Sequence, residues 1–501
     1  MTNSTMKKNQ TNSFTYTENG AICLSSTGNR LVDLFGTIGA LRNAEDNRKL
    51  KLFEDAVQEN KELAAKILFY GRDIREGLGE RDTFRTMLAY AADNHKEIVA
   101  PNIPLIGFYG RFDDLYCLDG TKCEDEMWSF MKEQFEKDLA NMKAGKPVSL
   151  LAKWIKTPDA SSENTKKLGI KTSQKLGYKK VGDFKKDLRA LRKYLDIVEI
   201  KVSANDFSTI AYDKVPSNAM AKYRKLFGLK DTDRFTKYID DVKSGKTEIK
   251  SNTLYPYDLV KPILNEIRSY YCRSRVKMNK TELDVIEAQW KALPNYIENG
   301  DNILIMSDVS GSMFCCDNLP ISTSIGLGMY FAERANGPFK DMFMTFDSTP
   351  KLVKVHGKDI YDKVNNMARA PWGGSTNLEA AFEVILKTAV DNKLDASQMP
   401  KALVIISDMQ IDSALHGTGT FYDMFEKRFA QAGYTMPNVI FWNVNSERDG
   451  FHAESAQRGV QYLSGHSVNT FKSLINCLNM TPVEAMMKVI CSDRYAPVTV
   501  A

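Results

Sequence analysis

The chain has 501 residues, of which 43% are hydrophobic and 26% charged, and its mean hydropathy is −0.36. This length exceeds one ordinary domain and predicts two or three. No apolar run approaches the roughly 20 residues that a membrane span needs, and the first ten residues lack the apolar core of a signal peptide. We therefore expect a globular cytoplasmic protein with no membrane partner.

The formal net charge of +5 is unevenly distributed. Residues 301–501 carry 17 Lys and Arg against 21 Asp and Glu, whereas residues 141–230 carry 21 against 8. A concentrated positive segment can contact the phosphates of a nucleic acid and release their counterions. Lysine is also common on solvated helix faces. Charge alone leaves both interpretations open.

The eight cysteines are scattered along the chain and form no C-x-x-C pair. This spacing argues against a zinc module and against a disulfide framework. We expect the thiols to be reduced and to lie mostly in the core.

The first half of the chain is predicted to be helical after a polar start. Asn, Thr and Ser dominate residues 1–20, which predicts a flexible tail. From residue 29 to about residue 293 the apolar residues follow the spacing of amphipathic helices. One predicted helix face consists of Phe84, Met87, Leu88 and Ala91.

The same helical spacing recurs over residues 184–198 and 235–242. Pro216 followed by Ser217 is typical of a helix start. Helices of this length, joined by short turns that contain Gly or Pro, predict a stacked helical-repeat domain over residues 21–298, although no repeat consensus is visible.

Two segments of this half are rich in charge. Residues 72–81 mix both signs around two glycines, and form either a ligand loop or, as we favour, a turn held by ion pairs. The second segment, residues 166–186, carries candidate RNA contacts. Its Tyr178 could stack on a base, although a Tyr is more commonly partly buried. The candidate lysines are Lys166, Lys167, Lys171, Lys175, Lys179, Lys180, Lys185 and Lys186.

The second half contains an apolar run, Ile303–Met306, that breaks into polar residues at alternate positions. Such a run is typical of a parallel strand covered on both faces. A second apolar run, Ala402–Ser407, is followed by the carboxylate of Asp408, and the Gly-Gly-Ser-Thr segment Gly373–Thr376 precedes a helical pattern. In an open α/β sheet, the loops after such strands meet in one crevice. The residues predicted to converge there are Asp308, Ser310, Ser312, Thr376 and Asp408.

Hydroxyls and carboxylates without Cys or His suit a hard divalent cation, Mg²⁺ or Mn²⁺, rather than zinc. The motif Asp-x-Ser-x-Ser alone is weak, and its placement beside Thr376 and Asp408 is what favours a metal site. The alternatives are a plain Asp/Ser turn and a nucleophilic Asp308, for which a second carboxylate at position 310 is missing.

Strands and helices are predicted to alternate from about residue 299 to 480, followed by a helix and tail over residues 481–501. This alternation favours a doubly wound, mostly parallel sheet, so the fold class is α plus α/β. We expect the histidines of this half to lie in surface loops. The predicted strands are 341–346, 351–355, 402–407, 438–444 and 460–463, and the helices 322–334, 377–390, 421–432, 470–477 and 481–490.

The five-residue cluster resembles the metal-ion-dependent adhesion site of von Willebrand factor A domains at all five positions. The resemblance implies a Rossmann-like domain in which Mg²⁺ keeps one open coordination position, which a carboxylate of a protein partner fills. Cys315 and Cys316 depart from the better-known members of that family and imply a different outer wall.

A further series of segments consists of Lys66–Arg75, Gly79–Arg81, Gly110–Asp114, Leu151–Trp154, Leu191–Leu195 and Leu254–Asp258. Together with the five-residue cluster, this series resembles the family of unknown function numbered 2828 over most of residues 45–480. That family resembles in layout the Ro (TROVE) proteins, in which a ring of HEAT-like helical repeats is joined to an A domain. The resemblance implies binding of small non-coding or misfolded RNA, but no individual RNA contact.

Two classes of function follow. The first is a non-enzymatic RNA-binding scaffold whose A domain holds Mg²⁺ and a partner carboxylate. The second is a protein-assembly module that uses the metal without nucleic acid. A metal-dependent hydrolase ranks third, below both of these classes, because no general base is evident beside the five predicted ligands.

Overall fold

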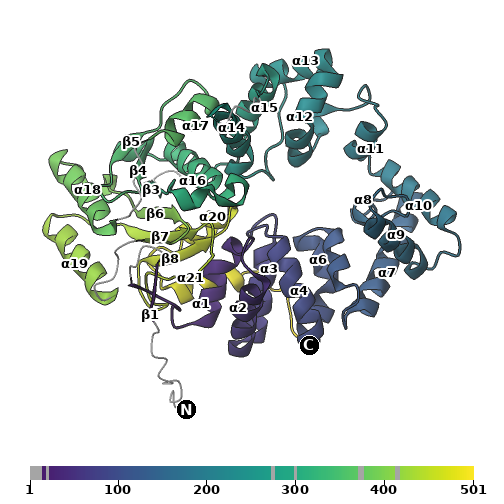
Figure 1. The fold of residues 1–501 in the computed structure, drawn as a ribbon, viewed down its shortest axis with the longest axis horizontal. Coiled ribbons are helices and arrows are strands. Elements are labelled where there is room, and N and C mark those ends of the chain that lie inside the picture. The colour runs from purple at the N-terminus through teal and green to yellow at the C-terminus, as the bar shows by residue number, and fades with distance from the viewer. Residues whose placement is uncertain are drawn as a thin grey trace. The chain divides into compact units, whose positions relative to one another are not determined.

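In the computed structural model, a six-stranded sheet lies at the centre of one unit, and helices make up the other (Figure 1). The sheet unit comprises the described residues of 1–48, 255–278 and 294–491, and the helical unit comprises 49–254, 279–293 and 492–501. The structure describes residues 14–17, 22–271, 277–297, 302–370, 377–411, 418–448 and 450–501.

The central strands of the sheet are the apolar runs of the second half. Every residue of β3 and β6 is buried, as expected for parallel strands with helices on both faces. Each predicted strand of this half is present, with ends that differ by no more than one residue. The strands are β3 (Ile303–Ser307), β4 (Met342–Thr345), β5 (Leu352–Lys354), β6 (Ala402–Ser407), β7 (Asn438–Asn443) and β8 (Val460–Ser464).

The strand order is β5-β4-β3-β6-β7-β8, and only the β4–β5 pair is antiparallel. From β3 the chain proceeds outward through β4 and β5, and from β6 it proceeds in the opposite direction through β7 and β8. This is the order of a doubly wound fold, with its topological switch point between β3 and β6. In register, Ser307 lies beside Ile406, so both strands end at the same edge of the sheet.

Helices of the sheet unit pack on this sheet from several parts of the chain. The helix α16 contacts β3, β4 and β6, and α14 and α17 pack against it; α1, α20 and α21 contact β8. The helices of this unit are α1 (Arg30–Thr37), α14 (Pro256–Tyr271), α16 (Cys315–Arg334), α17 (Ile360–Ala368), α18 (Leu378–Asp391), α19 (Thr418–Gln431), α20 (Asn469–Ile475) and α21 (Pro482–Ile490).

The unit boundaries differ from the predicted ones, because α1 and α14 lie in the sheet unit rather than in the helical domain predicted for residues 21–298. Glycines permit both close contacts. A Cβ on Gly36 of α1 would lie 2.9 Å from the Cβ of Tyr462 in β8, and a Cβ on Gly326 of α16 would lie 3.0 Å from the backbone of Pro256 in α14. The apolar spacing of a helix does not reveal which partner it packs against.

Part of the predicted flexible tail is ordered. The strands β1 (Phe14–Tyr16) and β2 (Ile22–Leu24) form an antiparallel pair, and Leu24 exchanges two backbone hydrogen bonds of 2.9 Å with Phe451. Residues 1–13 and 18–20 of that prediction lie outside the described residues.

Helices also account for the first half of the chain, as predicted. The face Phe84, Met87, Leu88 and Ala91 is buried, and α12 begins at Ser217 after Pro216. The helices are α2 (Asp46–Glu59), α3 (Lys61–Arg72), α4 (Asp82–Asn94), α5 (Lys96–Val99), α6 (Ile103–Tyr109), α7 (Glu124–Lys143), α8 (Leu151–Trp154), α9 (Glu163–Lys175), α10 (Val181–Tyr194), α11 (Val198–Ser203), α12 (Ser217–Lys230), α13 (Thr232–Lys243) and α15 (Lys280–Lys291).

The single helical pattern predicted over residues 184–198 is divided between two helices. The helix α10 ends at Tyr194, and Asp196 adopts a left-handed backbone conformation with φ of 49° before α11 begins. Leu191 is fully buried, whereas Leu195 is half-buried. The repeat and ring architecture stays a prediction.

The end of the chain is not a free tail. Arg494 forms two hydrogen bonds of 2.8 Å with the carboxylate of Asp73, and Tyr495 stacks on Tyr109 at 5.7 Å. The side chains of Tyr495 and Val498 are buried. Residues 492–501 therefore complete the core of the helical unit.

Within the described part of the chain, we find no helix with the length and apolarity needed to span a membrane.

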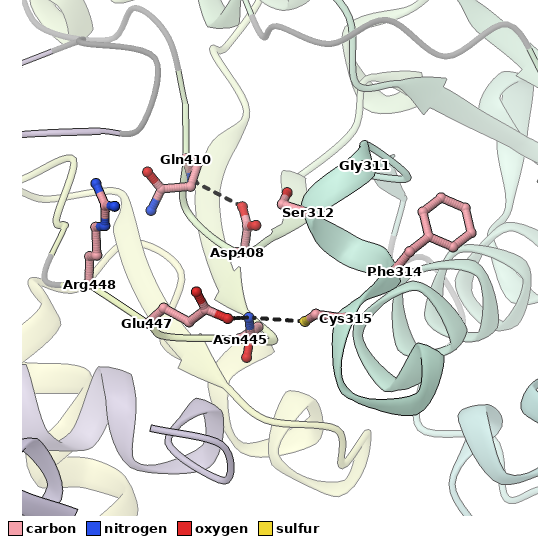
Figure 2. A pocket seen from close by; sticks show the side chains of 9 residues that line it. All are labelled: Gly311, Ser312, Phe314, Cys315, Asp408, Gln410, Asn445, Glu447 and Arg448. Carbon is pink, nitrogen blue, oxygen red and sulfur yellow. Dashed lines mark hydrogen bonds between the residues drawn. The ribbon is translucent and has the colours of Figure 1, made fainter. Parts of the chain in front are cut away.

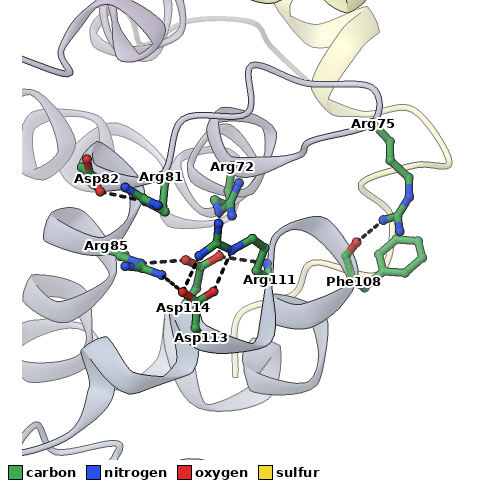
Figure 3. Close-up of polar contacts among 9 residues, drawn as sticks. All are labelled: Arg72, Arg75, Arg81, Asp82, Arg85, Phe108, Arg111, Asp113 and Asp114. Atoms are coloured by element: carbon green, nitrogen blue, oxygen red, sulfur yellow. Dashed lines mark hydrogen bonds and ion pairs between the residues drawn. The ribbon is translucent and has the colours of Figure 1, made fainter. Parts of the chain in front are cut away.

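The charged segment 72–81 is a turn held by ion pairs, as we favoured from the sequence. The Nε of Arg72 lies 2.7 Å from the carboxylate of Asp114, and both side chains are buried. Figure 3 shows Asp114 and Asp113 between the guanidinium groups of Arg85 and Arg111. A Cβ on Gly110 would lie 2.5 Å from Asp114, so only glycine fits beside this pair.

Candidate metal centre

Two of the predicted ligands follow neighbouring parallel strands at the switch point. Asp308 directly follows β3, and Asp408 directly follows β6. The backbone N–H of Asp308 donates a 3.0 Å hydrogen bond to the carbonyl of Ile406, which continues the β3–β6 pairing to the end of the strands. The sheet register therefore brings both carboxylates to one edge, as the sequence predicted.

The loop after β3 turns its polar side chains toward the same point. The carboxylate of Asp308 accepts a 2.7 Å hydrogen bond from the backbone N–H of Ser310. The hydroxyl oxygens of Ser310 and Ser312 lie 3.1 Å apart. A short 3-10 turn, η5 (Gly311–Phe314), begins directly after Ser310 and fixes this spacing.

The loop after β6 holds Asp408 in a similar manner. Its carboxylate accepts hydrogen bonds from the backbone N–H of Gln410 at 3.2 Å and from the hydroxyl of Ser407 at 3.4 Å. Met409 has a left-handed backbone conformation with φ of 67°, which is uncommon for a residue with a side chain. This turn directs the chain away from the strand directly after Asp408.

Both carboxylates are removed from water. The side chains of Asp308 and Asp408 are 1% and 7% exposed. Burial, together with the negative charge of Asp408, raises the pKa of Asp308 well above its ordinary value. A divalent cation between the two carboxylates would offset this repulsion. The oxygen donors present here therefore fit a hard cation such as Mg²⁺.

A cavity of about 420 Å³ opens over this end of the sheet (Figure 2). Ser312 and Asp408 line it, and so do residues from the loop after β7 that were not predicted from the sequence. Their position after a third parallel strand is the signal that could have revealed them. The lining residues are Gly311, Ser312, Phe314, Cys315, Asp408, Gln410, Asn445, Glu447 and Arg448.

The fifth predicted ligand, Thr376, lies outside the described residues. The helix that was predicted to follow it is present as α18, which begins at Leu378. Asn377 caps this helix by accepting a 3.0 Å hydrogen bond from the backbone N–H of Ala380.

The prediction that the histidines of the second half lie at the surface is wrong for two of them. His452 is 1% exposed and His466 is 2% exposed. Burial lowers the pKa of His452 to about 4 and that of His466 well below its ordinary value. His466 shares a 2.8 Å hydrogen bond with Thr323 of α16. His356 is exposed, and His416 lies outside the described residues.

The seven described cysteines are free thiols, and Cys272 lies outside the described residues. Cys23, Cys123 and Cys477 are buried, as predicted for core residues, whereas Cys491 is exposed. The pair Cys315 and Cys316 is half-buried beside the cavity.

The eight candidate RNA-binding lysines lie on α9, on α10 and on the short connection between them. Three of them already have carboxylate partners. Lys171 lies 2.6 Å from Asp119, Lys175 lies 3.5 Å from Glu124, and Lys185 lies 2.9 Å from Asp159. The positive charge of this segment is therefore partly offset within the protein, which the one-dimensional charge count did not show.

The other five lysines, Lys166, Lys167, Lys179, Lys180 and Lys186, are exposed. Tyr178 beside them is not presented for stacking on a base. Its hydroxyl donates a 2.7 Å hydrogen bond to Asp187, and its ring packs edge-on against Phe184. The structure supports the alternative in which this Tyr is partly buried.

The fold and the cluster together define a helical unit joined to a doubly wound α/β unit with an oxygen-rich switch point. Family models match both parts. The model described as "Domain of unknown function (DUF2828)" matches residues 17–108 and 157–302, which confirms that resemblance. The model described as "Domain of unknown function (DUF7788)" matches residues 302–494.

Two individual proteins are similar over most of their length. Uncharacterized protein L728 of Acanthamoeba polyphaga mimivirus is 27% identical over 527 residues, which cover 95% of this chain and 87% of that protein. The alignment with the crystal structure of the RO (RSR) protein of Deinococcus radiodurans covers 92% of each chain, with 13% sequence identity and a TM-score of 0.36. A TM-score this low carries no weight for function.

Proposed function

We propose that this chain is a non-enzymatic RNA-binding scaffold whose sheet unit holds Mg²⁺ and, through it, a carboxylate of a protein partner. The observation that carries the metal part is the pair of buried carboxylates, Asp308 and Asp408, at the switch point beside an open cavity. The RNA part rests on the exposed lysines of α9 and α10 and on the resemblance to the Ro layout. Binding rather than catalysis is proposed because both carboxylates are assigned to the cation.

The residues that would hold the cation are Asp308, Ser310, Ser312 and Asp408, together with Thr376 outside the described residues. This set matches the adhesion site of von Willebrand factor A domains, and we propose that the sheet unit is a domain of that family. When bound, Mg²⁺ or Mn²⁺ would supply an electrophilic position for a carboxylate oxygen. The cavity beside Ser312 and Asp408 provides room for an acidic side chain.

A thermal unfolding experiment tests the metal part. Saturating Mg²⁺ or Mn²⁺ should raise the melting temperature of the full chain, since a ligand at 100 times its Kd stabilises a protein by about 2.7 kcal/mol. Asp308→Asn should remove this shift. In chelator the variant should melt at or above the wild type, because one of two neighbouring buried charges is gone.

The matched control is Asp423→Asn, which removes an exposed carboxylate from α19 of the same unit. The control should keep the full metal-dependent shift. A wild-type melting temperature that ignores both metals, or an equal shift in Asp308→Asn, contradicts the proposed site.

The alternative function is protein assembly through the metal site without nucleic acid. The ion pairs of Lys171, Lys175 and Lys185 favour it, because they reduce the charge available for phosphates. Absorbance of the purified chain separates the two functions. Nucleic acid that copurifies and is removed by ribonuclease supports the scaffold, and a chain free of RNA that also fails to bind RNA at low salt supports the assembly module.

A further inference from the structure

A second group of potential metal ligands lies at the cavity beside the oxygen cluster. The sulfur atoms of Cys315 and Cys316 and a carboxylate oxygen of Glu447 all lie within 4.8 Å of one another. Cys315 begins α16, and Glu447 lies in the loop after β7. Figure 2 shows the side chains of Cys315 and Glu447 with Asn445 between them.

A buried amide positions two of these groups. The Nδ2 group of Asn445 donates hydrogen bonds to the sulfur of Cys315 at 3.4 Å and to a carboxylate oxygen of Glu447 at 3.2 Å. Asn445 itself is 5% exposed, and its backbone N–H donates to the side chain of Asn443 at 3.1 Å. Hydrogen bonds of this kind orient the ligands of metal sites from outside the first coordination shell.

The backbone at this point departs from a helix. Cys316, Asp317 and Asn318 all have left-handed conformations, with φ of 54°, 57° and 60°. Side chains of neighbouring residues in a regular α-helix do not face each other. Here the left-handed turn replaces the helical geometry, and the sulfur atoms of both Cys315 and Cys316 lie near the carboxylate of Glu447.

The chemistry of this group differs from that of the oxygen cluster. Two thiolates and one carboxylate are a donor set for zinc, which accepts sulfur and oxygen ligands, whereas Mg²⁺ prefers oxygen alone. Three protein ligands leave the fourth tetrahedral position open, as in sites where zinc binds an exogenous ligand. Here Cys315 and Glu447 both line the cavity.

We propose that Cys315, Cys316 and Glu447 form a second cation site that binds a thiophilic divalent ion of the zinc class, opening onto the cavity of the oxygen cluster. Binding replaces the protons of the two thiols with two metal–sulfur bonds and adds one metal–oxygen bond. Two protons pass to the solvent, and three ligand charges offset the double charge of the ion. No oxidation accompanies the step.

Cobalt provides a direct test, because thiolate ligands give Co²⁺ a charge-transfer absorption that oxygen ligands do not give. The full chain is titrated with Co²⁺ in saturating Mg²⁺ and a non-thiol reductant. We expect one equivalent of Co²⁺ to produce the thiolate band and Zn²⁺ to remove it. Mg²⁺ does not absorb, so the outcome is independent of whether the oxygen cluster binds metal.

Two variants assign the ligands. Cys316→Ser should reduce the intensity of the band and weaken Co²⁺ binding at least about tenfold, since even supporting residues of metal sites contribute this much. Glu447→Gln, at an exposed position, should keep the band and weaken binding by a similar factor. The matched control is Cys491→Ser, which removes an exposed thiol that follows α21 and should change neither quantity.

Several results would overturn the proposal. A wild-type chain without a thiolate band at one equivalent of Co²⁺ has no such site. A band that persists unchanged in Cys316→Ser, or that disappears in Cys491→Ser, places the sulfur ligands elsewhere. If Cys316→Ser fails to fold, the wild-type titration and Glu447→Gln still decide, because unchanged binding in Glu447→Gln excludes this carboxylate.

Discussion

At the residue scale, burial of ionisable groups influences the stability of both units. His452 and His466 are enclosed in the sheet unit, where burial disfavours their charged forms. Both histidines therefore hold fewer protons in the folded state than in the unfolded chain when the solution is mildly acidic. The stability of the sheet unit is thereby linked to pH.

The first residue-scale prediction concerns acid unfolding. The folded pKa of His452 is about 4 and the ordinary pKa of histidine is about 6.5, so stability is present above pH 6.5 and is lost as the pH falls toward 4. Between pH 7 and pH 5, protonation of this histidine in the unfolded chain should lower the free energy of unfolding by roughly 2 kcal/mol. His452→Gln should reduce that loss in denaturant titrations at the two pH values.

Exposed His356 provides the control, because His356→Gln should leave the pH dependence of the wild type unchanged. An identical acid dependence in His452→Gln and the wild type would show that this histidine does not control the loss.

The second residue-scale prediction concerns the carboxylate of Asp114, which is fully buried and lies 2.7 Å from the guanidinium groups of both Arg72 and Arg85. Asp114→Asn removes the charge that compensates the buried Arg72. Breaking a buried pair in this way costs about 3–5 kcal/mol. The loss should appear in the free energy of unfolding of the helical unit.

Asp82→Asn is the matched control, because Asp82 pairs with Arg81 at 3.0 Å with both side chains exposed. Exposed pairs contribute about 0–1 kcal/mol. Equal effects of Asp82→Asn and Asp114→Asn on stability would be evidence against a special role of the buried network.

At the scale of elements, α9, α10 and the connection between them present five exposed lysines on the proposed RNA surface. Among the described residues these five form no ion pair, whereas Lys171, Lys175 and Lys185 are already paired. The unpaired lysines are the sharper target for mutation. Their charges meet solvent, so contacts to phosphate would release counterions without breaking an internal ion pair.

We predict that charge reversal of exposed lysines weakens RNA binding through this surface. If about six phosphates are contacted, the wild-type affinity should fall about a thousandfold between 50 and 200 mM salt. The variant should bind less tightly at low salt and show a shallower salt dependence. Filter binding measures both quantities. The substituted residues are Lys166, Lys167, Lys179 and Lys180, each changed to Glu.

A control with the same change of net charge uses four exposed lysines of the sheet unit, whose reversal should leave RNA affinity nearly unchanged. If both variants lose affinity to the same degree, RNA responds to net charge and α9 and α10 are not its surface. The control residues are Lys340, Lys351, Lys354 and Lys358.

At the scale of the whole molecule, the proposed metal ligands and the candidate RNA-binding lysines lie in different units. Residues 301–501 carry a net negative charge, whereas residues 141–230 carry a net positive charge. Phosphates favour the latter segment, and a divalent cation favours the former. The two proposed binding functions should therefore be separable by mutation.

Ser312→Ala tests this separation, since it removes one exposed hydroxyl that lines the cavity and little packing. The variant should bind Mn²⁺ more weakly in electron paramagnetic resonance titrations, while its affinity for RNA should stay within about threefold of the wild type. A tenfold loss of RNA affinity with unchanged circular dichroism would mean that the cation belongs to the RNA site.

The sequence by itself determined the elements and the chemistry of the cluster. Apolar runs identified β3 and β6, helical spacing identified the buried face of α4, and Asp308 and Asp408 could be placed together because parallel strands end at one edge. These inferences succeed because they depend on local periodicity and on a general rule of sheet topology.

Only the tertiary structure decided which distant segments complete each unit. It placed α1 and α14 with the sheet, residues 492–501 with the helices, and Glu447 beside Cys315. It also paired Lys171 with Asp119 and buried His452. The physical reason is that burial and pairing depend on neighbours brought together by folding, whereas periodicity and charge counts describe each segment in isolation.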